Sequence, residues 1–123
     1  MAPDKNKDLK QAEKTEVASY FNGMGFDRWN RIYSDTDDVN KVQRNIRIGH
    51  QKTVDDVLSW LKESQPLGNL SFCDAGCGVG SLSLPLALMG AGSIAASDIS
   101  QSMIDETKRR AELAKIDMSK IQF

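Results

Sequence analysis

The sequence predicts an α/β fold in which parallel strands follow a helical N-terminal segment. Short β-like runs are expected at residues 70–74, at 93–97 and from 121, with helices between them at 81–89 and 101–115. This alternation is typical of parallel strands joined by right-handed crossovers. Because the chain reaches its last residue, 123, just as the third strand begins, we expect a truncated domain that carries only the first half of a doubly wound sheet.

Upstream of the first strand the apolar residues recur at helical spacing. Helices are expected over 9–24, 26–33 and 39–63, with Gly49 as a candidate break in the third and Val42 on its inward face. Residues 1–8 are polar and charged, and we expect a disordered tail there. The predicted organisation is therefore a tail (1–8), a helical lid segment that could contact an acceptor (9–63) and an incomplete cofactor-binding domain (64–123).

Composition narrows the class of protein. Sixteen basic and 17 acidic side chains leave a net charge of −1, which argues against a nucleic-acid surface. Cys73 and Cys77 are too close along one turn for a good disulfide, and His50 is the single histidine, so no metal site is predicted. Two reduced thiols favour a cytosol-like compartment.

The turn after the first strand, Asp74-Ala-Gly-Cys-Gly-Val-Gly80, carries the strongest functional signal. Its third glycine follows the second by two residues, whereas the dinucleotide fingerprint spaces them by three. No Lys-Ser or Lys-Thr pair follows, which excludes a P-loop. Asp74 would repel a pyrophosphate but attract the ammonium group of S-adenosylmethionine (SAM). The turn therefore favours a SAM pocket over a dinucleotide pocket.

Asp98 strengthens this interpretation because it ends the second strand, 98 − 80 = 18 residues after the last glycine. An acid at that place can accept both hydroxyls of a ribose. An ordinary helix-capping role is the alternative. The combined pattern predicts a Rossmann-like class I methyltransferase fold. Its expected cofactor-binding residues are Asp74, Gly76, Cys77, Gly78, Gly80 and Asp98, with Ile99 and Met103 beside the adenine and His50 near the methionine end or Asp74.

Several segments resemble the magnesium-protoporphyrin IX methyltransferase family of chlorophyll biosynthesis. They are Tyr20–Trp29, Ile46–His50 and Cys73–Ser83, within a similarity that covers about residues 13–110. The resemblance implies methyl transfer from SAM to a propionate carboxylate of magnesium protoporphyrin IX, with Tyr33 as the acceptor-site residue. It also implies a plastid or cyanobacterial location, peripheral membrane association, and the large subunit of magnesium chelatase as a partner. Residues 64–66 depart from the family pattern.

The lid segment offers groups that suit a flat, acidic macrocycle, although each has an ordinary structural alternative. Its aromatic residues could form a wall or could simply pack, and its arginines could pair with propionates or lie in solvent. These residues are Tyr20, Phe21, Phe26, Trp29 and Tyr33, and Arg28, Arg31, Arg44 and Arg47. Two other functions stay open: methylation of another small acid or quinone, and a binding-only role. We expect the 123-residue chain by itself to be inactive.

Overall fold

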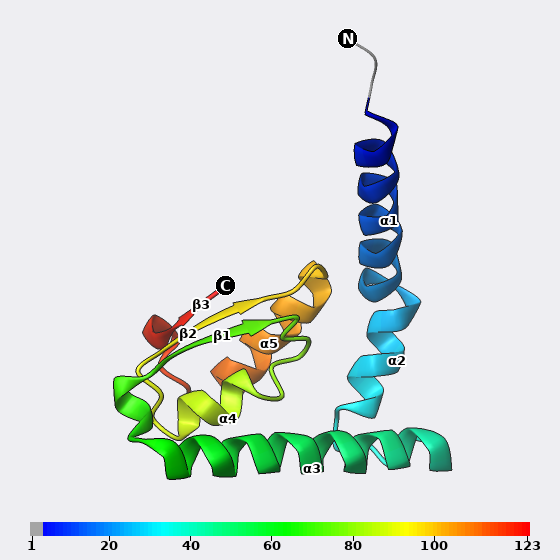
Figure 1. The fold of residues 1–123 in the computed structure, drawn as a ribbon. Coiled ribbons are helices and arrows are strands. Elements are labelled where there is room, and N and C mark those ends of the chain that lie inside the picture. Colours follow the sequence, from blue (N-terminus) through cyan, green and yellow to red (C-terminus); the bar gives the residue numbers. More distant parts are fainter. Residues whose placement is uncertain (1–3) are drawn as a thin grey trace.

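The computed structural model describes residues 4–123 and contains a small parallel sheet flanked by helices (Figure 1). The N-terminal helices are α1 (Lys5–Asn22), α2 (Met24–Ile32) and α3 (Lys41–Ser64). The sheet region comprises β1 (Ser71–Ala75), α4 (Ser83–Leu88), β2 (Ser93–Ser97), α5 (Gln101–Leu113) and β3 (Ile121–Gln122). Short 3-10 turns at Leu67–Asn69 and Met118–Lys120 precede β1 and β3.

The sheet has the order β1-β2-β3, and both strand pairs are parallel. Asp74 of β1 is level with Ala96 of β2, and Ile94 of β2 is level with Ile121 of β3. The predicted alternation of strands and helices in one parallel sheet is confirmed. Its physical consequence is that the carboxyl ends of β1 and β2 open at the same edge, beside α1 and α2 (Figure 1).

The core lies on one side of this sheet. Ile94 and Ala96 of β2 are 2% exposed, and they pack with buried residues of α4 and α5. Leu58 and Leu61 of α3 pack against the same cluster. Residues that alternate with the buried ones, such as Cys73 and Ala95, have small side chains and are exposed. Burial of one apolar stripe per strand is the main force that holds the helices to the sheet.

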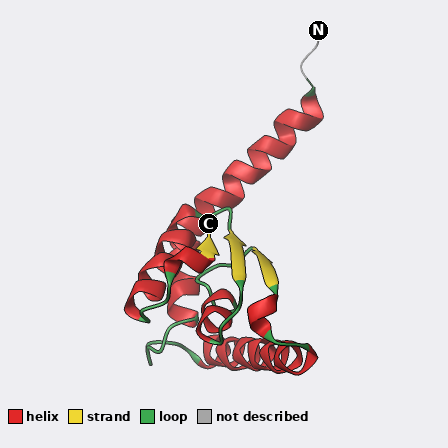
Figure 2. Ribbon diagram, turned by 90° about the vertical axis from the view of Figure 1, so that its left-hand side faces the viewer, coloured by secondary structure: helices red, strands yellow, loops and turns green. Residues whose placement is uncertain are grey.

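Helices α1 and α2 follow each other in a nearly continuous column beside the sheet, and the N-terminal part of α1 projects away from it (Figures 1 and 2). Gly23 separates the two helices, so α1 ends earlier than the expected residue 24. A Cβ atom at Gly25 would lie 2.5 Å from the ring of Tyr20, so a larger residue there would displace this partly exposed ring. Gly25 therefore allows the Tyr20 ring to pack closely on α2.

The tail prediction is wrong for residues 5–8, which form the first turns of α1; residues 1–3 lie outside the described part of the chain. The Asp4 side chain accepts a hydrogen bond from the Asn6 backbone N–H at 3.1 Å. This N-cap satisfies one of the free donors at the helix start. A polar composition therefore did not prevent the helix, because its end is capped.

Helix α3 runs without interruption through Gly49, so the candidate break does not occur. Asn40 and Gln43 form a reciprocal capping box at its start. Val42, expected on the inward face, is 67% exposed because the first turns of α3 extend past the body that its later turns cover (Figure 1). Pro85 lies in the first turn of α4, which begins at Ser83. The N–H groups of a first turn have no acceptor within the helix, so a proline at this place removes no helical hydrogen bond.

Helix α5 is tied to the lid helices at both ends. At its start, the Asn22 side-chain oxygen accepts hydrogen bonds from the Ser100 hydroxyl at 2.8 Å and the Ser102 N–H at 3.0 Å. Near its end, Arg110 donates to the Asn30 side-chain oxygen at 2.7 Å. Ser100, the N-cap residue of α5, also accepts a hydrogen bond from the Met103 N–H. These contacts join segments about 80 residues apart in sequence.

No helix within residues 4–123 is long and apolar enough to cross a membrane.

Glu106 gives the fold a testable pH dependence. Arg109 lowers the pKa of this carboxyl group to about 2, burial opposes the shift, and Arg110 lowers it further. Because the folded-state pKa lies below the unfolded value, the stabilisation is complete above about pH 4.5 and is lost as the pH falls toward 2. In a full-length protein that includes residues 1–123, Glu106→Gln should reduce the unfolding free energy by about 1–3 kcal/mol at pH 7.

Chemical denaturation of the Glu106→Gln variant and the parent, repeated between pH 7 and pH 3, checks this expectation. The gap between the two midpoints should narrow as the pH falls. A constant gap over this range would contradict the assignment. Asp105→Asn, on the same helix but exposed and paired only with Gln101, is the matched control and should show a smaller gap.

Candidate functional site

The glycine turn after β1 folds back onto the end of β2. The N–H groups of Gly76 and Cys77 both donate to the Ser97 carbonyl, at 2.7 and 2.8 Å. Gly76 and Gly78 have φ values of +75° and +54°, a region that L side chains rarely adopt. A Cβ atom built on either residue meets nothing within 4 Å. The turn thus presents bare backbone to open space.

Gly80 has a different role from the other two glycines. Its φ is +81°, and a Cβ atom there would lie 2.8 Å from the Thr107 methyl group and 2.9 Å from Leu84. Gly80 is buried. The structure places it at a packing contact between the turn, α4 and α5, so it supports the pocket from behind.

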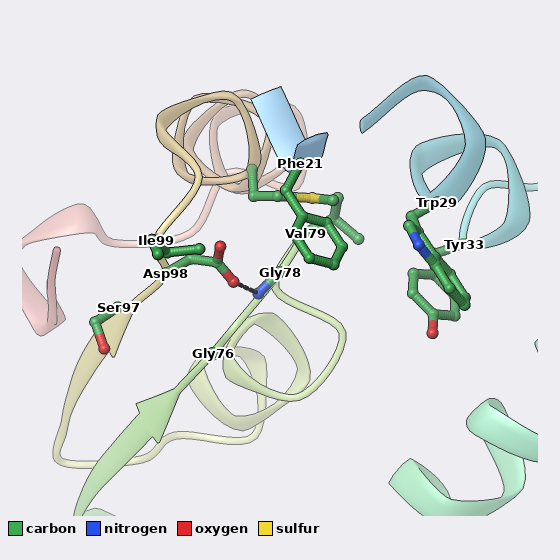
Figure 3. A pocket seen from close by; sticks show the side chains of 10 residues that line it. Phe21, Trp29, Tyr33, Gly76, Gly78, Val79, Ser97, Asp98 and Ile99 are labelled. Carbon is green, nitrogen blue, oxygen red and sulfur yellow. Dashed lines mark hydrogen bonds between the residues drawn. The ribbon is translucent and has the colours of Figure 1, made fainter. Parts of the chain in front are cut away.

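Asp98 is the carboxylate that joins the two strand ends. One oxygen accepts a hydrogen bond from the backbone N–H of Gly78 at 2.9 Å (Figure 3). The other accepts from the backbone N–H of Ser100, also at 2.9 Å. A carboxylate has about four acceptor positions, so these bonds leave room for ligand hydroxyls. Asp98 therefore also has part of the helix-capping role that was the alternative, because its side chain accepts a hydrogen bond from the N-cap residue of α5. The same contacts fix the carboxylate at the pocket.

A cavity of about 750 Å³ lies between the strand ends and the lid helices. One wall consists of Gly76, Gly78 and Asp98, and the opposite wall carries the rings of Trp29 and Tyr33 (Figure 3). The volume is within the range of small-molecule sites. The remaining lining residues are Phe21, Val79, Ser97, Ile99 and Met103. The cavity is thus polar near the turn and apolar toward the lid.

A second, smaller cavity of about 200 Å³ continues from the turn toward α3. Asp74, His50 and Tyr33 are among its lining residues, together with Gly76 and Gly78 of the turn. Asp74 accepts a hydrogen bond from the Ser83 hydroxyl at 2.6 Å, which holds the carboxylate in place. The structure therefore places His50 and Asp74 in the lining of one cavity. The two cavities share Tyr33 and the glycine turn.

Tyr33 stands in the middle of a row of three rings. Its centroid is 5.6 Å from Trp29 and 4.2 Å from His50, and both pairs are stacked. Burial raises the pKa of Tyr33 and lowers the pKa of His50. At neutral pH the pair therefore consists of a phenol and a neutral imidazole. Stacking fixes the three rings relative to one another.

Cys77 contributes its backbone to the turn, while its side chain belongs largely to the core. It is 7% exposed and is part of the central hydrophobic cluster. Burial, followed by the charges of Asp74 and Asp98, raises the pKa of the thiol to about 11. The thiolate is the reactive form of cysteine, so this group is inert at neutral pH. Both cysteines are free.

Four lining residues were not among the expected site residues. Val79 lies between two glycines of the turn and Ser97 precedes Asp98, so their places in the motif were the available signals. For Phe21 and Trp29 the sequence left packing and a wall of the site as alternatives, and both reach the cavity, Phe21 from the end of α1 (Figure 3). Within residues 4–123, no group of three or more His, Cys, Asp or Glu side chains is arranged to hold a metal ion.

Arg47 does not act as a free cation for an acidic ligand. Its guanidinium group donates to the carbonyl oxygens of Arg31, Ile32 and Thr36, at 2.6–3.0 Å. The idea that it pairs with a propionate is therefore not supported, because most of its donors are used in the protein. Arg28, by contrast, lies over the Trp29 ring at 5.9 Å.

Comparisons with known proteins agree with this geometry. Residues 72–123 match a methyltransferase domain family. A magnesium-protoporphyrin O-methyltransferase of Synechocystis is 55% identical over 100 residues, which are 81% of this chain and 43% of the relative. The chloroplastic magnesium protoporphyrin IX methyltransferase of Arabidopsis thaliana is 45% identical over 115 residues, which are 89% and 36% of the two chains.

A solved structure supports the same relationship. The crystal structure of magnesium protoporphyrin IX methyltransferase from Synechocystis with bound SAH superimposes with a TM-score of 0.82 at 51% identity. The match covers 89% of this chain and 49% of that one. The chain spans about half or less of the length of the relatives it matches. Over the part that they share, this chain is similar in both sequence and fold to magnesium-protoporphyrin IX methyltransferases.

Proposed function

We propose that this chain forms the cofactor half and the lid of a SAM-dependent O-methyltransferase. The observation that carries the proposal is the fixed Asp98 carboxylate beside two open glycines at the mouth of a 750 Å³ cavity. The relatives named above support it, as does a Synechocystis structure described with bound SAM. Bound SAM would supply an activated methyl group on a positively charged sulfur.

The described residues suit the three parts of this cofactor. Asp98 can accept hydrogen bonds from the ribose hydroxyls through its remaining lone pairs. Ile99 and Met103 line the same cavity and offer apolar contacts for the adenine. Asp74 and His50 lie in the adjoining cavity, where the carboxylate can attract the ammonium group of the methionine part. Gly76 and Gly78 let the ligand approach the backbone closely.

For the acceptor we propose a propionate side chain of magnesium protoporphyrin IX. A propionic acid has a pKa near that of glutamate, about 4.3, so it is ionised at neutral pH and needs no general base. The protein must then orient a carboxylate oxygen toward the methyl carbon and exclude water. The rings of Trp29 and Tyr33 line the larger cavity and His50 lines the smaller one, so they offer apolar contacts for the macrocycle. The Tyr33 hydroxyl is a donor that can orient the carboxylate.

We further propose a plastid or cyanobacterial location, with action at a membrane surface and beside the large subunit of magnesium chelatase. The Arabidopsis relative is named as chloroplastic, and a second relative comes from a cyanobacterium. A chelatase that inserts magnesium into protoporphyrin would make the proposed acceptor. Co-purification with that subunit, with and without the porphyrin, is a direct measurement of the partnership.

The first prediction tests the cofactor in a full-length protein that includes residues 1–123. Asp98→Ala should weaken the binding of S-adenosylhomocysteine by about 1–3 kcal/mol, because hydrogen bonds to a charged group are lost. Asp105→Ala, which removes an exposed acid from α5, should leave binding unchanged. Isothermal titration calorimetry measures both affinities. Binding of NAD, or equal affinities of the Asp98→Ala variant and the parent, would contradict the proposal.

The second prediction tests the acceptor side. Tyr33→Phe should lower turnover with magnesium protoporphyrin IX about tenfold while S-adenosylhomocysteine affinity stays within about twofold, because the hydroxyl acts on the carboxylate. Tyr20→Phe removes a hydroxyl from a lid tyrosine whose ring packs on Phe21, and it serves as control. If cofactor affinity falls as much as turnover in Tyr33→Phe, the hydroxyl serves the cofactor instead.

A further inference from the structure

The end of α2 is held in an unusual way. The last carbonyl groups of a helix have no partner within the helix and need donors from elsewhere. At the end of α2, the carbonyls of Arg31, Ile32 and Tyr33 all accept hydrogen bonds from arginine side chains of other helices. Tyr33, whose ring lines both cavities, is the residue that follows the helix. The backbone that carries this ring is therefore fixed by side chains from outside α2.

Arg47 approaches from α3. Its Nε donates to the Ile32 carbonyl at 2.6 Å, and its Nη2 lies 3.0 Å from the carbonyls of Arg31 and Thr36. Ile32 is fully buried beside this contact. A planar guanidinium group presents its donors in a rigid fork, whereas the three donors of a lysine rotate on a single nitrogen at the end of a flexible stem. Arg47 thus joins the end of α2, the following turn and α3.

Arg110 approaches the same helix end from α5. Its Nη1 donates to the Tyr33 carbonyl at 3.0 Å and its Nη2 to the Asn30 side chain at 2.7 Å. Its Nε donates to Glu106 at 3.0 Å, and the side chain of Glu106 is only 9% exposed. Two positive charges at a helix C-terminus are also favourable toward the helix dipole. Glu106 therefore aims Arg110 at the residue that carries the acceptor-site ring.

We propose that Arg47 and Arg110 form a two-arginine clamp that positions the Tyr33 ring between the two cavities. The clamp rests on the methyltransferase function proposed above, because Tyr33 acts there on the acceptor. Neither arginine lines the 750 Å³ cavity or the smaller cavity that Asp74 lines, so in this proposal both act through the residues at the end of α2 that they hold. They are positioning residues. Arg110 also links the Tyr33 carbonyl to α5, the helix that starts beside Asp98.

The first experiment measures the clamp without any ligand or activity. Hydrogen–deuterium exchange is followed for the backbone of residues 26–36 in the full-length protein. Arg110→Ala and Arg47→Ala should each speed exchange in this segment about tenfold, because a local opening becomes easier. Lys108→Ala and Lys52→Ala remove exposed cations from α5 and α3 whose contacts are with Phe123 and Asp56 and not with α2 or Glu106, so exchange in residues 26–36 should stay at the parent rate.

Arg110→Lys keeps the positive charge but loses the planar guanidinium group. It is included because Arg110→Ala by itself could cause a general folding defect. It should also speed exchange in residues 26–36, while exchange in β1 and β2 stays as in the parent. Unchanged exchange at residues 26–36 in both Arg110 variants would overturn the clamp. Equally faster exchange over the whole domain in both variants would overturn it as well, because that result indicates a loss of global stability and not a local release of residues 26–36.

The second experiment asks whether Arg110 acts through Tyr33. Arg110→Ala should lower kcat about tenfold when Tyr33 is present, but less than about twofold in the Tyr33→Phe background, because the positioned hydroxyl is already gone. Equal loss in both backgrounds would overturn the proposal. If the parent protein shows no methyl transfer, the proposed function fails, and the exchange measurement still decides whether the arginines hold α2.

Discussion

The arrangement of the site depends on the hydrogen bonds that tie the glycine turn to the end of β2. Gly76 and Cys77 donate to the Ser97 carbonyl, and Gly78 donates to the Asp98 carboxylate. Through these bonds the turn and the acid form one rigid rim, although they are 20 residues apart in sequence. Positive φ values at the glycines are what allow three successive N–H groups to face the neighbouring strand.

Helix α5 connects this rim to the lid helices. Its first residues bind the Asn22 side chain at the end of α1, and Arg110 in its last turn binds the end of α2. The rim and the aromatic wall are therefore both joined by hydrogen bonds to α5. Buried polar contacts of this kind give a defined geometry that apolar packing alone would leave loose. The cavity between them owes its shape to α5 as much as to the sheet.

The sequence predicted the region after residue 70 well because its signals are local. The alternating strands and helices and the glycine turn each depend on neighbouring residues. The lid was predicted less completely. Capping by Asp4 began α1 earlier than its polarity suggested. For Phe21 the sequence left open packing or a place in the wall, and the structure shows that it lines the cavity. For Arg47 the sequence offered a propionate or solvent as partner, whereas its partners are backbone carbonyls that lie 11–16 residues away in sequence.

By itself, the sequence determined which residues could make a cofactor pocket, because glycines and acids at strand ends have few other uses in that order. Only the tertiary structure decided which of them face the cavity. Gly80 packs against Thr107, and the Cys77 side chain lies in the core. Arg47 and Arg110 donate hydrogen bonds to the backbone around Tyr33. The physical reason is that burial and hydrogen bonding are settled by contacts between segments, and residue spacing within one segment does not contain them.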